Sequence, residues 1–584
     1  MKFFARCLYV SLILMVFFFS ACVVEADDDF SSSVSTQASG SSFSASKRLY
    51  INLTNRTVSA DNATFTTIQD TESFFLNNTV AVSLLDSVVI KIDATNITEN
   101  LAVNFEGTLS TGGVKIQTTT DHEIGVYLNN VSITSSNYPC FDITKGGSAS
   151  VFLTGTNSLV DGRTYGYGYG SEYASTSQNP VSDGSDSKGT LYCKGGLSLS
   201  GSGSLSVVQA YKNCIASKDG TLTIESGTYT LANYKKSTYA PLTDYSSTSA
   251  TGKNGLFGGR AVVINGGDIT FYGNGLVSSS ECRKANGIKT DDDDYPSSSV
   301  TITGGKLSIT TYNGKGIAAP YVYIKGGSNT INVRGTTSYT GDSAGGMRAM
   351  GGFGGGNAPG ASSTNSGGTS TSGSWYDADG VKESGTITFA AEGIEGVYRV
   401  EISGGTTEVT ATDDGINVSG SSASFVLSGG SVYTYSLSGD GIDSNGSISV
   451  SGGTAVSYAP TGSEDSFDSD GKITISGGTI AGVSGSQMAL SEYSTSGQKL
   501  LYFTGGSLGS VAVSLSGSLA YAFELPSSSY GLFVMSSPRF TSSSASSYTV
   551  YSSPTFSGGT DFHGLYTTLP TVSDGSSTKT PSIK

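Results

Sequence analysis

The sequence predicts an all-β fold, a single-stranded parallel β-helix or solenoid with rungs of about 22–25 residues. Three observations support this prediction. Gly-Gly pairs recur at a nearly constant spacing, the runs beside them alternate Val, Ile and Thr with polar residues at a period of two, and helix signals are absent throughout. The composition agrees, because 79 glycines among 584 residues, with only 14% charged residues, are typical of a repeat array.

The Gly-Gly pairs set the period. In runs such as "VEISGGTTEVTA" and "KITISGGTIAGV" we expect the glycines at turns. Successive pairs are 22 residues apart in one cluster and 25, 23 and 25 apart in the next: Gly304 and Gly326, then Gly404, Gly429, Gly452 and Gly477. Three short strands and three turns fit such a unit, and units would stack at about 4.8 Å. A β-propeller is the chief alternative, but its blades need about 40–50 residues, twice this period.

The chain begins with a segment typical of export. Lys2 and Arg6 precede an apolar stretch from Leu8 to Phe19, followed by small residues. Two cleavage sites remain open: "FSAC", ending at Cys22, resembles a lipoprotein box, whereas "VVEA", ending at residue 26, suits ordinary signal peptidase. We expect a secreted or cell-surface protein, touching the membrane at most through a lipid on Cys22. No later stretch approaches the roughly 20 apolar residues of a spanning helix.

Composition shifts divide the chain. The Gly-Gly period fades beyond about residue 489, and a stacked array needs its end covered, so we expect a C-terminal β-cap. The predicted segments are 1–26, a signal peptide or a lipoprotein signal to Cys22; 27–48, a Ser/Asp-rich tether; 49–490, the parallel β-helix, interrupted by a disordered Gly/Ser-rich loop at 335–374; 491–570, the β-cap; and 571–584, a flexible tail.

The charge and histidine content exclude several functions. Acidic residues outnumber basic ones 47 to 32, so a net charge of −15 argues against nucleic acid or an anionic membrane as the partner. A neutral partner, or an anionic one bridged by cations, fits better. Only His122 and His563 are present, which leaves little room for a histidine triad or a His-rich metal site. Any catalysis would use carboxylates, Lys, Arg or Tyr.

Four cysteines follow Cys22, too few to be the framework of so long a chain: Cys140, Cys193, Cys214 and Cys282. Cys193 and Cys214 are 21 residues apart, near one period. They could stack as a disulfide or as a ladder of free thiols, and both interpretations remain open.

Acidic residues recur at one position of the repeat. "AEGIEG", "ATDDGINVSG", "GDGIDSNG" and "GSEDSFDSDG" place a carboxylate before a small residue, an apolar residue and a second carboxylate or amide. One predicted column contains Glu392, Asp414, Asp440 and Asp465, and a second contains Glu395, Asn417, Asp443 and Asp468. The apolar residue between them is expected to fill the core. Earlier repeats, "KNCIAS", "ANGIKT" and "GKGIAA", keep it and lose the acids, so the acids are not a general requirement of the fold.

These columns predict calcium. Carboxylates about 4.8 Å apart repel by roughly 3 kcal/mol at an effective dielectric constant near 20. Ca²⁺–oxygen distances of about 2.3–2.6 Å allow one ion to join ligands from two rungs. The predicted ligands are Glu392, Glu395, Asp413, Asp414, Asn417, Asp440, Asp443, Asp465 and Asp468. The alternative is that they are polar turn residues, since Asp-Gly is favoured wherever a turn needs positive φ.

Exposed aromatic residues are candidates for sugar contact. Trp375 and Tyr376 occur in "WYDADG", beside the Gly/Ser-rich loop, and Tyr165 and Tyr167 in "YGYGYG". The alternatives are a hydrophobic anchor for the tryptophan and low-complexity drift for the tyrosine run.

Several passages resemble a known family. "GTLYCKGGLSLSGSGSLSVVQAYKNCIASKDGTLTI", "AEGIEGVYRVEISGG", "ATDDGINVSG" and "GDGIDSNGSISVSGGT" are similar to the bacterial family of secreted carbohydrate-binding domain proteins, over roughly residues 100–560. The resemblance implies a right-handed, polysaccharide-lyase-like parallel β-helix that carries calcium. It also implies binding of cellulose and acidic plant polysaccharides without known cleavage. Departures are Cys140 and Cys214 at small-residue positions, and Ser466-Phe467 in place of Gly-Ile.

Three functions follow as predictions. The first is calcium-dependent, non-catalytic binding of extracellular polysaccharide, cellulose or pectin-like, at the cell surface. The second is a polysaccharide lyase acting on uronate polymers, for which Arg399, Lys382 and Lys289 are the available bases. The third is a structural surface adhesin without a sugar ligand. The first is the leading prediction, so the chain is expected to be a binding protein rather than an enzyme.

Overall fold

The computed structural model describes residues 43–60, 64–70, 74–135, 138–162, 189–208, 212–233, 253–278, 281–283, 285–335, 338–340, 375–376, 382–383, 386–388, 391–507, 509–525 and 529–584. The signal segment with Cys22, nearly all of the predicted tether, the tyrosines Tyr165 and Tyr167, and residues 341–374 of the predicted loop lie outside these ranges.

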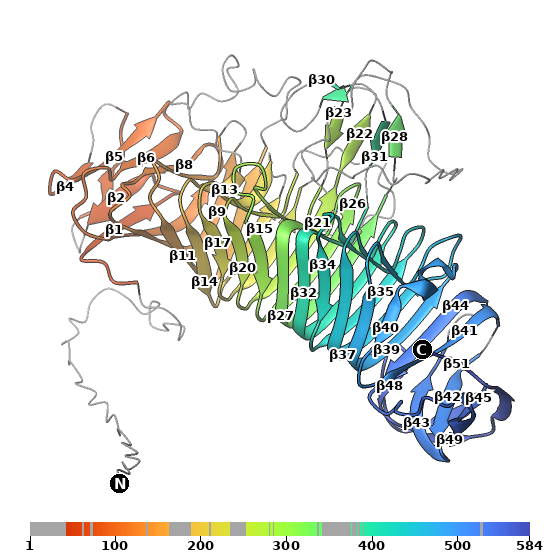
Figure 1. Ribbon diagram of the computed structural model, residues 1–584. Coiled ribbons are helices and arrows are strands. Elements are labelled where there is room, and N and C mark those ends of the chain that lie inside the picture. Colours follow the sequence, from red (N-terminus) through yellow and green to blue (C-terminus); the bar gives the residue numbers. More distant parts are fainter. Residues whose placement is uncertain are drawn as a thin grey trace, which may run out of the picture. The chain divides into compact units, whose positions relative to one another are not determined.

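Most described residues form strands of one large sheet, in which parallel strands from successive repeats lie side by side in three stacks (Figure 1). The first stack carries the acidic columns. Its strands are β6(Val89–Asp93), β8(Gly113–Gln117), β10(Phe141–Thr144), β13(Gly189–Cys193), β16(Asn213–Ser217), β19(Leu256–Gly258), β24(Ile288–Thr290), the start of β27(Ile317–Arg334), the start of β32(Ile394–Ala411), β33(Ile416–Val418), β36(Ile442–Ser444) and β38(Phe467–Ser469).

The second stack continues each repeat. Its strands are β1(Lys47–Asn52), β7(Leu101–Leu109), β9(Ile124–Ser135), β11(Ala149–Thr154), β14(Leu197–Gly201), β17(Thr221–Ile224), β20(Ala261–Ile264), β25(Ser299–Ile302), then β27, β32, β34(Ser424–Leu427), β37(Ser447–Ala459), β39(Ile473–Ser484) and β40(Tyr493–Thr495).

The third stack completes the repeat. Its strands are the later part of β9, β12(Thr156–Asp161), β15(Ser204–Val208), β18(Thr228–Ala232), β21(Asp268–Asn274), β26(Lys306–Tyr312), then β27, β32, β35(Ser431–Ser436), β37 and β39.

The prediction of an open, single-stranded right-handed parallel β-helix is wrong. The 12-residue β9 and the 18-residue β27 each pair in both the second and the third stack, so the hydrogen-bonded ladder returns to its start. The result is a closed barrel of 12 parallel strands: β9, β11, β14, β17, β20, β25, β27, β26, β21, β18, β15 and β12.

The reason for the error lies in the Gly-Gly pairs, which the sequence places at turns. In β27 the strand continues through Gly326 and Gly327, where Gly327 has a φ of 83°. Only glycine adopts that conformation without strain, so the backbone can bend while the residues on either side stay paired with the neighbouring strand. The strand therefore does not end at the corner, and two stacks share it.

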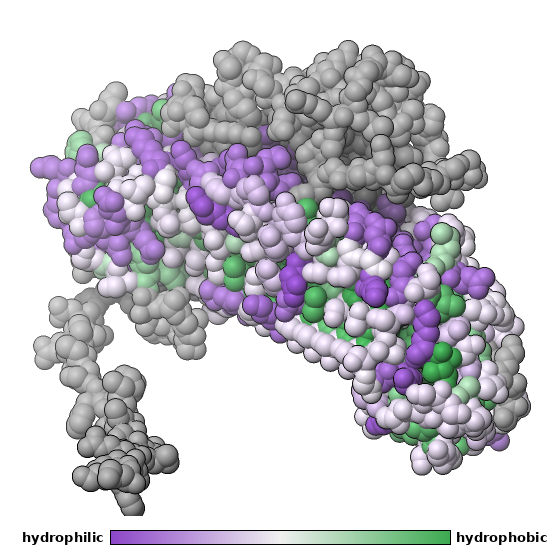
Figure 2. Space-filling view, viewed as in Figure 1, coloured by the Kyte–Doolittle hydropathy of each residue, from purple (hydrophilic) through white to green (hydrophobic). Residues whose placement is uncertain are grey.

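The core consists of aliphatic side chains that repeat at the same position of successive strands. Ile302, Ile324, Ile402 and Leu427 are paired neighbours in the second stack and are fully buried. Burial of each such side chain stabilises the fold by about 1.5–3 kcal/mol. Along each strand the alternate residues point outward. The surface seen in Figure 2 is largely hydrophilic or intermediate in hydropathy.

Antiparallel strands occur near the start of the chain and in short two-stranded pairs beside the parallel stacks. Near the start of the chain lie β2(Thr57–Ala60), β3(Thr66–Thr67), β4(Phe74–Leu76) and β5(Val80–Leu85). Short two-stranded pairs are formed by β22(Leu276–Ser278) with β23(Glu281–Arg283), β28(Ser338–Thr340) with β31(Thr386–Thr388), and β29(Trp375–Tyr376) with β30(Lys382–Glu383).

The last repeat is covered by a strand of opposite direction. β44(Tyr530–Ser537) pairs with β39 and with β41(Lys499–Gly506). A six-stranded sheet follows, built of β42(Val511–Leu515), β43(Ser518–Phe523), β45(Tyr548–Ser552), β47(Thr560–Phe562), β48(Leu565–Thr568) and β50(Ser576–Lys579), around a second hydrophobic core.

Residues 571–584 do not form the predicted flexible tail. They contain β49(Thr571–Ser573), which pairs with β46(Thr555–Ser557), then β50, and finally β51(Ser582–Ile583), which pairs with β41. Within the described ranges the only helical segments are the 3-10 turns η1(Met488–Ser491) and η2(Ala545–Ser547). No described helix has the length and apolar character needed to cross a membrane.

Candidate metal centre

The predicted acidic columns exist. In the first stack Ile394, Ile416, Ile442 and Phe467 are paired neighbours and are buried, as the sequence predicts. One residue further on, Glu395, Asn417, Asp443 and Asp468 pair in the same register. The period therefore places these side chains on consecutive strands, one above the next.

The other column is tied to the backbone. Oδ1 of Asp414 accepts a hydrogen bond from the amide of Asp440 at 2.8 Å, and Oδ1 of Asp440 accepts one from the amide of Asp465 at 2.6 Å. Oδ2 of Asp465 accepts from the amide of Ala489 at 3.3 Å. One oxygen of each carboxylate thus satisfies a backbone donor of the next repeat. This part of the column has a structural role. Gly415 and Gly441, which follow Asp414 and Asp440, are not among the glycines with positive φ, so the need for positive φ does not explain these Asp-Gly pairs.

At the N-terminal end of the columns the ammonium group of Lys315 lies between two carboxylates that were predicted to bind calcium. Nζ of Lys315 lies 3.0 Å from Oε2 of Glu392 and 2.5 Å from Oε2 of Glu395, and all three side chains are at most 8% exposed. Nδ2 of Asn417 donates to Oε1 of Glu392 at 3.1 Å and to Oδ2 of Asp414 at 3.0 Å. Glu392 and Glu395, both predicted calcium ligands, therefore share one ammonium group, which balances one of their two negative charges.

Sequence reasoning missed this lysine, although its position was readable. "GKGIAA" places Lys315 at the same position as Glu392 one repeat earlier. The column continues further as amides, with Asn254 donating to Asn213 at 2.9 Å and Asn286 to Asn254 at 3.1 Å. Hydrogen-bonded amides, one ammonium and then carboxylates thus follow one another along the first stack.

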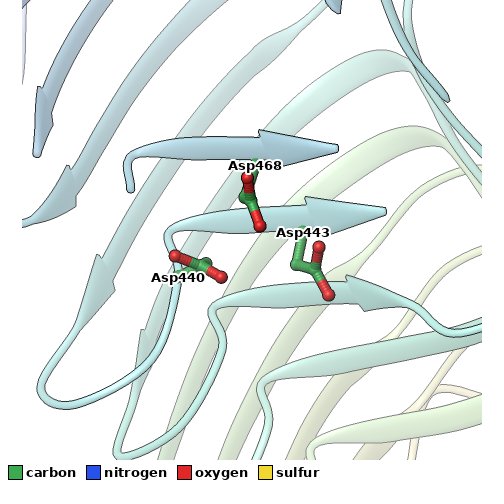
Figure 3. Close-up of side chains that lie close together, drawn as sticks. All are labelled: Asp440, Asp443 and Asp468. Carbon is green, nitrogen blue, oxygen red and sulfur yellow. The ribbon is translucent and has the colours of Figure 1, made fainter. Parts of the chain in front are cut away.

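Three of the nine predicted ligands come together as one cluster. Carboxylate oxygens of Asp440, Asp443 and Asp468 lie within 4.8 Å of one another, and the side chains are half-buried. Asp440 lies on the turn before β36, Asp443 on β36 and Asp468 on the neighbouring β38 (Figure 3). The cluster thus spans two consecutive repeats.

The electrostatics of the cluster favour a bound cation or proton. Burial, followed by repulsion from neighbouring carboxylates, raises the pKa of Asp440, Asp443 and Asp468 above the ordinary range. The same causes raise the pKa of Glu492, in the next repeat, to about 7. Burial raises the pKa of Asp465 to about 6. A divalent ion would remove the repulsion and restore the ionised forms.

Unsatisfied oxygens border the cluster. Among the described residues, Oδ1 of Asn417, Oδ1 of Asp465 and Oε2 of Glu492 are buried without a hydrogen-bond partner. Carboxylate and amide oxygens are the donors that Ca²⁺ prefers, with six to eight ligands in a flexible arrangement. The donor set therefore fits calcium. Glu492 is a residue that sequence reasoning missed, because no Gly-Gly pair or plug motif marks its repeat.

The family comparison is decisive for the class of protein. A family model described as carbohydrate-binding domain-containing protein matches residues 93–436. The chain belongs to this family. Membership implies that the protein binds polysaccharide, which confirms the predicted family and ligand class at that level. The match includes Lys315 and its glutamates and ends before Asp440, so the three-aspartate cluster lies outside the matched segment.

Other comparisons add little. No curated protein matches the chain. A solved structure titled as the polysaccharide lyase-like protein from C. thermocellum, a gadolinium derivative, is 19% identical, with 48% of this chain and 90% of that chain covered. Its TM-score of 0.33 is too low for a conclusion about fold or function.

The remaining predicted residues do not join the cluster. Asp413 lies beside Asp414, and burial raises the pKa of its carboxyl, but it is not one of the three converging aspartates. Trp375 and Tyr376 form β29, and Lys382 lies on the paired β30. The other two lyase bases are engaged by carboxylates: Arg399 contacts Glu401 at 2.9 Å and Lys289 contacts Asp292 at 2.7 Å.

The two alternatives for Cys193 and Cys214 are resolved. Both are buried free thiols, and Cys140 is also buried. Cys193 pairs with Ser217 rather than with Cys214, because the repeat here is 24 residues long and the two cysteines are only 21 apart. Neither a disulfide nor a thiol ladder joins them. Burial raises the pKa of Cys193 to about 12, so its thiol stays protonated.

Proposed function

We propose that this carbohydrate-binding domain protein binds extracellular polysaccharide without cleaving it, and that calcium held by Asp440, Asp443 and Asp468 is required. The observation that carries the proposal is the convergence of three carboxylates from two repeats within 4.8 Å. Calcium would supply positive charge and flexible oxygen coordination there. The three aspartates would hold it, with Asp465, Asn417 and Glu492 offering the unsatisfied oxygens nearby.

The aspartates fix two repeats relative to each other. Asp440 and Asp443 belong to one repeat and Asp468 to the next. Without neutralisation, their repulsion opposes the stacking of β36 on β38, so the ion would rigidify this part of the surface. The proposed role is therefore structural support of a binding surface rather than activation of a bond.

Binding without cleavage is supported by the basic side chains. A lyase needs a base that reaches the α-proton of a uronate. Two of the three candidate bases, Arg399 and Lys289, are engaged by carboxylates. The proposal that the protein is exported rests on the signal predicted for residues 1–26. The protein is then either secreted freely or held at the cell surface by a lipid on Cys22.

The experiment is retention of the mature protein on insoluble cellulose and on pectin, in calcium and in chelator. We expect retention in calcium and its loss in chelator. Asp443→Asn with Asp468→Asn should abolish the calcium effect, whereas Asp121→Asn, an exposed aspartate in an early repeat that lacks the acidic columns, should not. Retention on neither polymer, or equal retention in chelator, contradicts the proposal. An unsaturated uronate product on incubation with polygalacturonate would show a lyase instead.

A further inference from the structure

A cluster of tyrosines lies on the outer face of the second stack. Two of them are on β27, the strand that begins two residues after the buried Lys315. Tyr321 and Tyr323 are on β27, with ring centroids 6.3 Å apart and ring planes 7° from parallel. Tyr398, on the neighbouring β32, has its centroid 5.3 Å from that of Tyr321 and is 47% exposed. β27 and β32 lie side by side (Figure 1).

Tyr321 and Tyr323 pair with Arg399 and Glu401 on β32, and the two strands beyond β27 and β32 carry smaller side chains at these positions. On the preceding strand Ser299 and Thr301 pair with Tyr321 and Tyr323. On the strand after β32, Ser424 pairs with Arg399 and Val426 with Glu401. Tyr321 and Tyr323 are therefore flanked by smaller side chains on β25. A ring with an apolar body and a hydroxyl tip suits a ligand that is apolar on its faces and polar at its edges.

Charged groups border the rings. Nζ of Lys325 lies 5.7 Å from the ring centroid of Tyr323 and its side chain is exposed. Arg399 contacts Glu401 at 2.9 Å and donates from Nη1 to Oγ of Ser424 at 3.2 Å. Two cations and one carboxylate thus surround the tyrosines, a local balance opposite in sign to the net charge of −15.

We propose that Tyr321, Tyr323 and Tyr398 form a platform for the pyranose rings of a uronate-containing polysaccharide, with Lys325 contacting a uronate carboxylate. The assignment rests on the proposed function and locates its ligand. The carbon–hydrogen faces of a pyranose lie against the tyrosine rings, and its hydroxyls meet Arg399 and Glu401. The platform lies inside the segment matched by the carbohydrate-binding family model.

The charge beside the platform differs from the net charge of the whole chain. The overall charge of −15 suggests that an acidic polymer needs bridging cations. Beside the rings, however, Glu401 balances Arg399, and Lys325 leaves a net positive charge. Acidic polymer can therefore be held here by the chain's own side chains. Calcium at Asp440, Asp443 and Asp468 would act on stiffness, at a different position.

The test measures the affinity of the mature protein for polygalacturonate oligosaccharides by calorimetry, in calcium. The variants are Tyr323→Ala with Tyr398→Ala, and Lys325→Gln. The control is Tyr272→Ala, a half-buried tyrosine on the third stack. We expect the double variant to lose about tenfold or more in affinity, and Lys325→Gln to lose affinity for polygalacturonate but not for its fully methyl-esterified, neutral form. Circular dichroism should show that each variant is folded at the temperature of the affinity measurement.

Each outcome has a distinct meaning. If the unaltered protein binds no polysaccharide, the proposed function fails together with the platform. If it binds and the double variant binds equally well, the platform alone is overturned. If Lys325→Gln weakens binding to both oligosaccharides equally, the assignment of a uronate ligand is overturned. If the tyrosine variants instead change the oligomeric state of the free protein, the rings belong to a contact between copies and the platform is rejected.

Discussion

The amide nitrogen of Asp465 donates a hydrogen bond of 2.6 Å to Oδ1 of Asp440. Asp440 therefore has two tasks: one oxygen holds the backbone of the next repeat, while the carboxylate as a whole contributes to the cluster with Asp443 and Asp468. The two tasks need different chemistry, because the hydrogen bond needs only an acceptor and the ion needs negative charge.

This dual role gives the first prediction. Asp440→Asn keeps an oxygen that can accept the Asp465 amide, so stability in chelator should change by less than about 1 kcal/mol, while the stabilisation by calcium is lost. Asp440→Ala removes the acceptor and should cost about 1–3 kcal/mol in chelator as well. Urea unfolding with and without calcium separates the two. Equal unfolding free energies of both variants in chelator would contradict the structural task.

The second prediction concerns pH. Burial holds the pKa of Asp465 at about 6 and, with nearby carboxylates, that of Glu492 at about 7, above their ordinary values of 3.8 and 4.5. In chelator the folded state then binds more protons than the unfolded chain between about pH 4 and 7, so stability should fall as pH rises through this window. In calcium the trend should reverse, because the ion binds the ionised carboxylates. Melting temperatures from pH 4 to 8 check both signs.

The third prediction concerns the internal cation. Lys315→Met would leave Glu392 and Glu395 buried without the ammonium they share. We expect a loss of about 3–5 kcal/mol in the free energy of unfolding at pH 7, with partial recovery in the triple variant that adds Glu392→Gln and Glu395→Gln.

A surface pair provides the control for that prediction. Lys306 lies 3.9 Å from Asp268 and its side chain is 66% exposed, so Lys306→Met should change stability by less than about 1 kcal/mol. If Lys315→Met were as mild as Lys306→Met, the lysine would not be the counter-ion of the two glutamates.

Sequence reasoning succeeded where the period alone decides position. Asp443 and Asp468 are paired neighbours because equal spacing places equivalent residues together, and this could be read from the glycines. It failed where one strand spans a corner, as at Gly326, because a glycine signals a bend without showing whether pairing continues. The tyrosine platform was also missed. Tyr321 and Tyr398 are in contact, but the stretch that interrupts the period separates them in the sequence. Their spacing therefore does not match one repeat and does not predict the contact.

The last prediction concerns the small residue of the acidic turn. A Cβ on Gly441 would lie 2.0 Å from Oγ of Ser457 on the third stack. One repeat later Ser466 occupies the corresponding place, and Gly482, the neighbour of Ser457 in the third stack, faces it instead. At these two levels a side chain is thus present on the first stack where it is absent on the third, or the reverse, which explains how the last repeat departs from the glycine pattern.

This exchange can be tested by substitution. Gly441→Ala should overpack the interior and cost about 1–3 kcal/mol, and adding Ser457→Gly should recover part of that loss by removing the facing side chain. Ser457 also donates a hydrogen bond of 2.6 Å to the carbonyl oxygen of Ser466, so Ser457→Gly alone should destabilise. The measured quantity is the coupling free energy of the double-mutant cycle, which should be favourable for the pair. A cycle with zero coupling would show that the two positions do not compete for the same space.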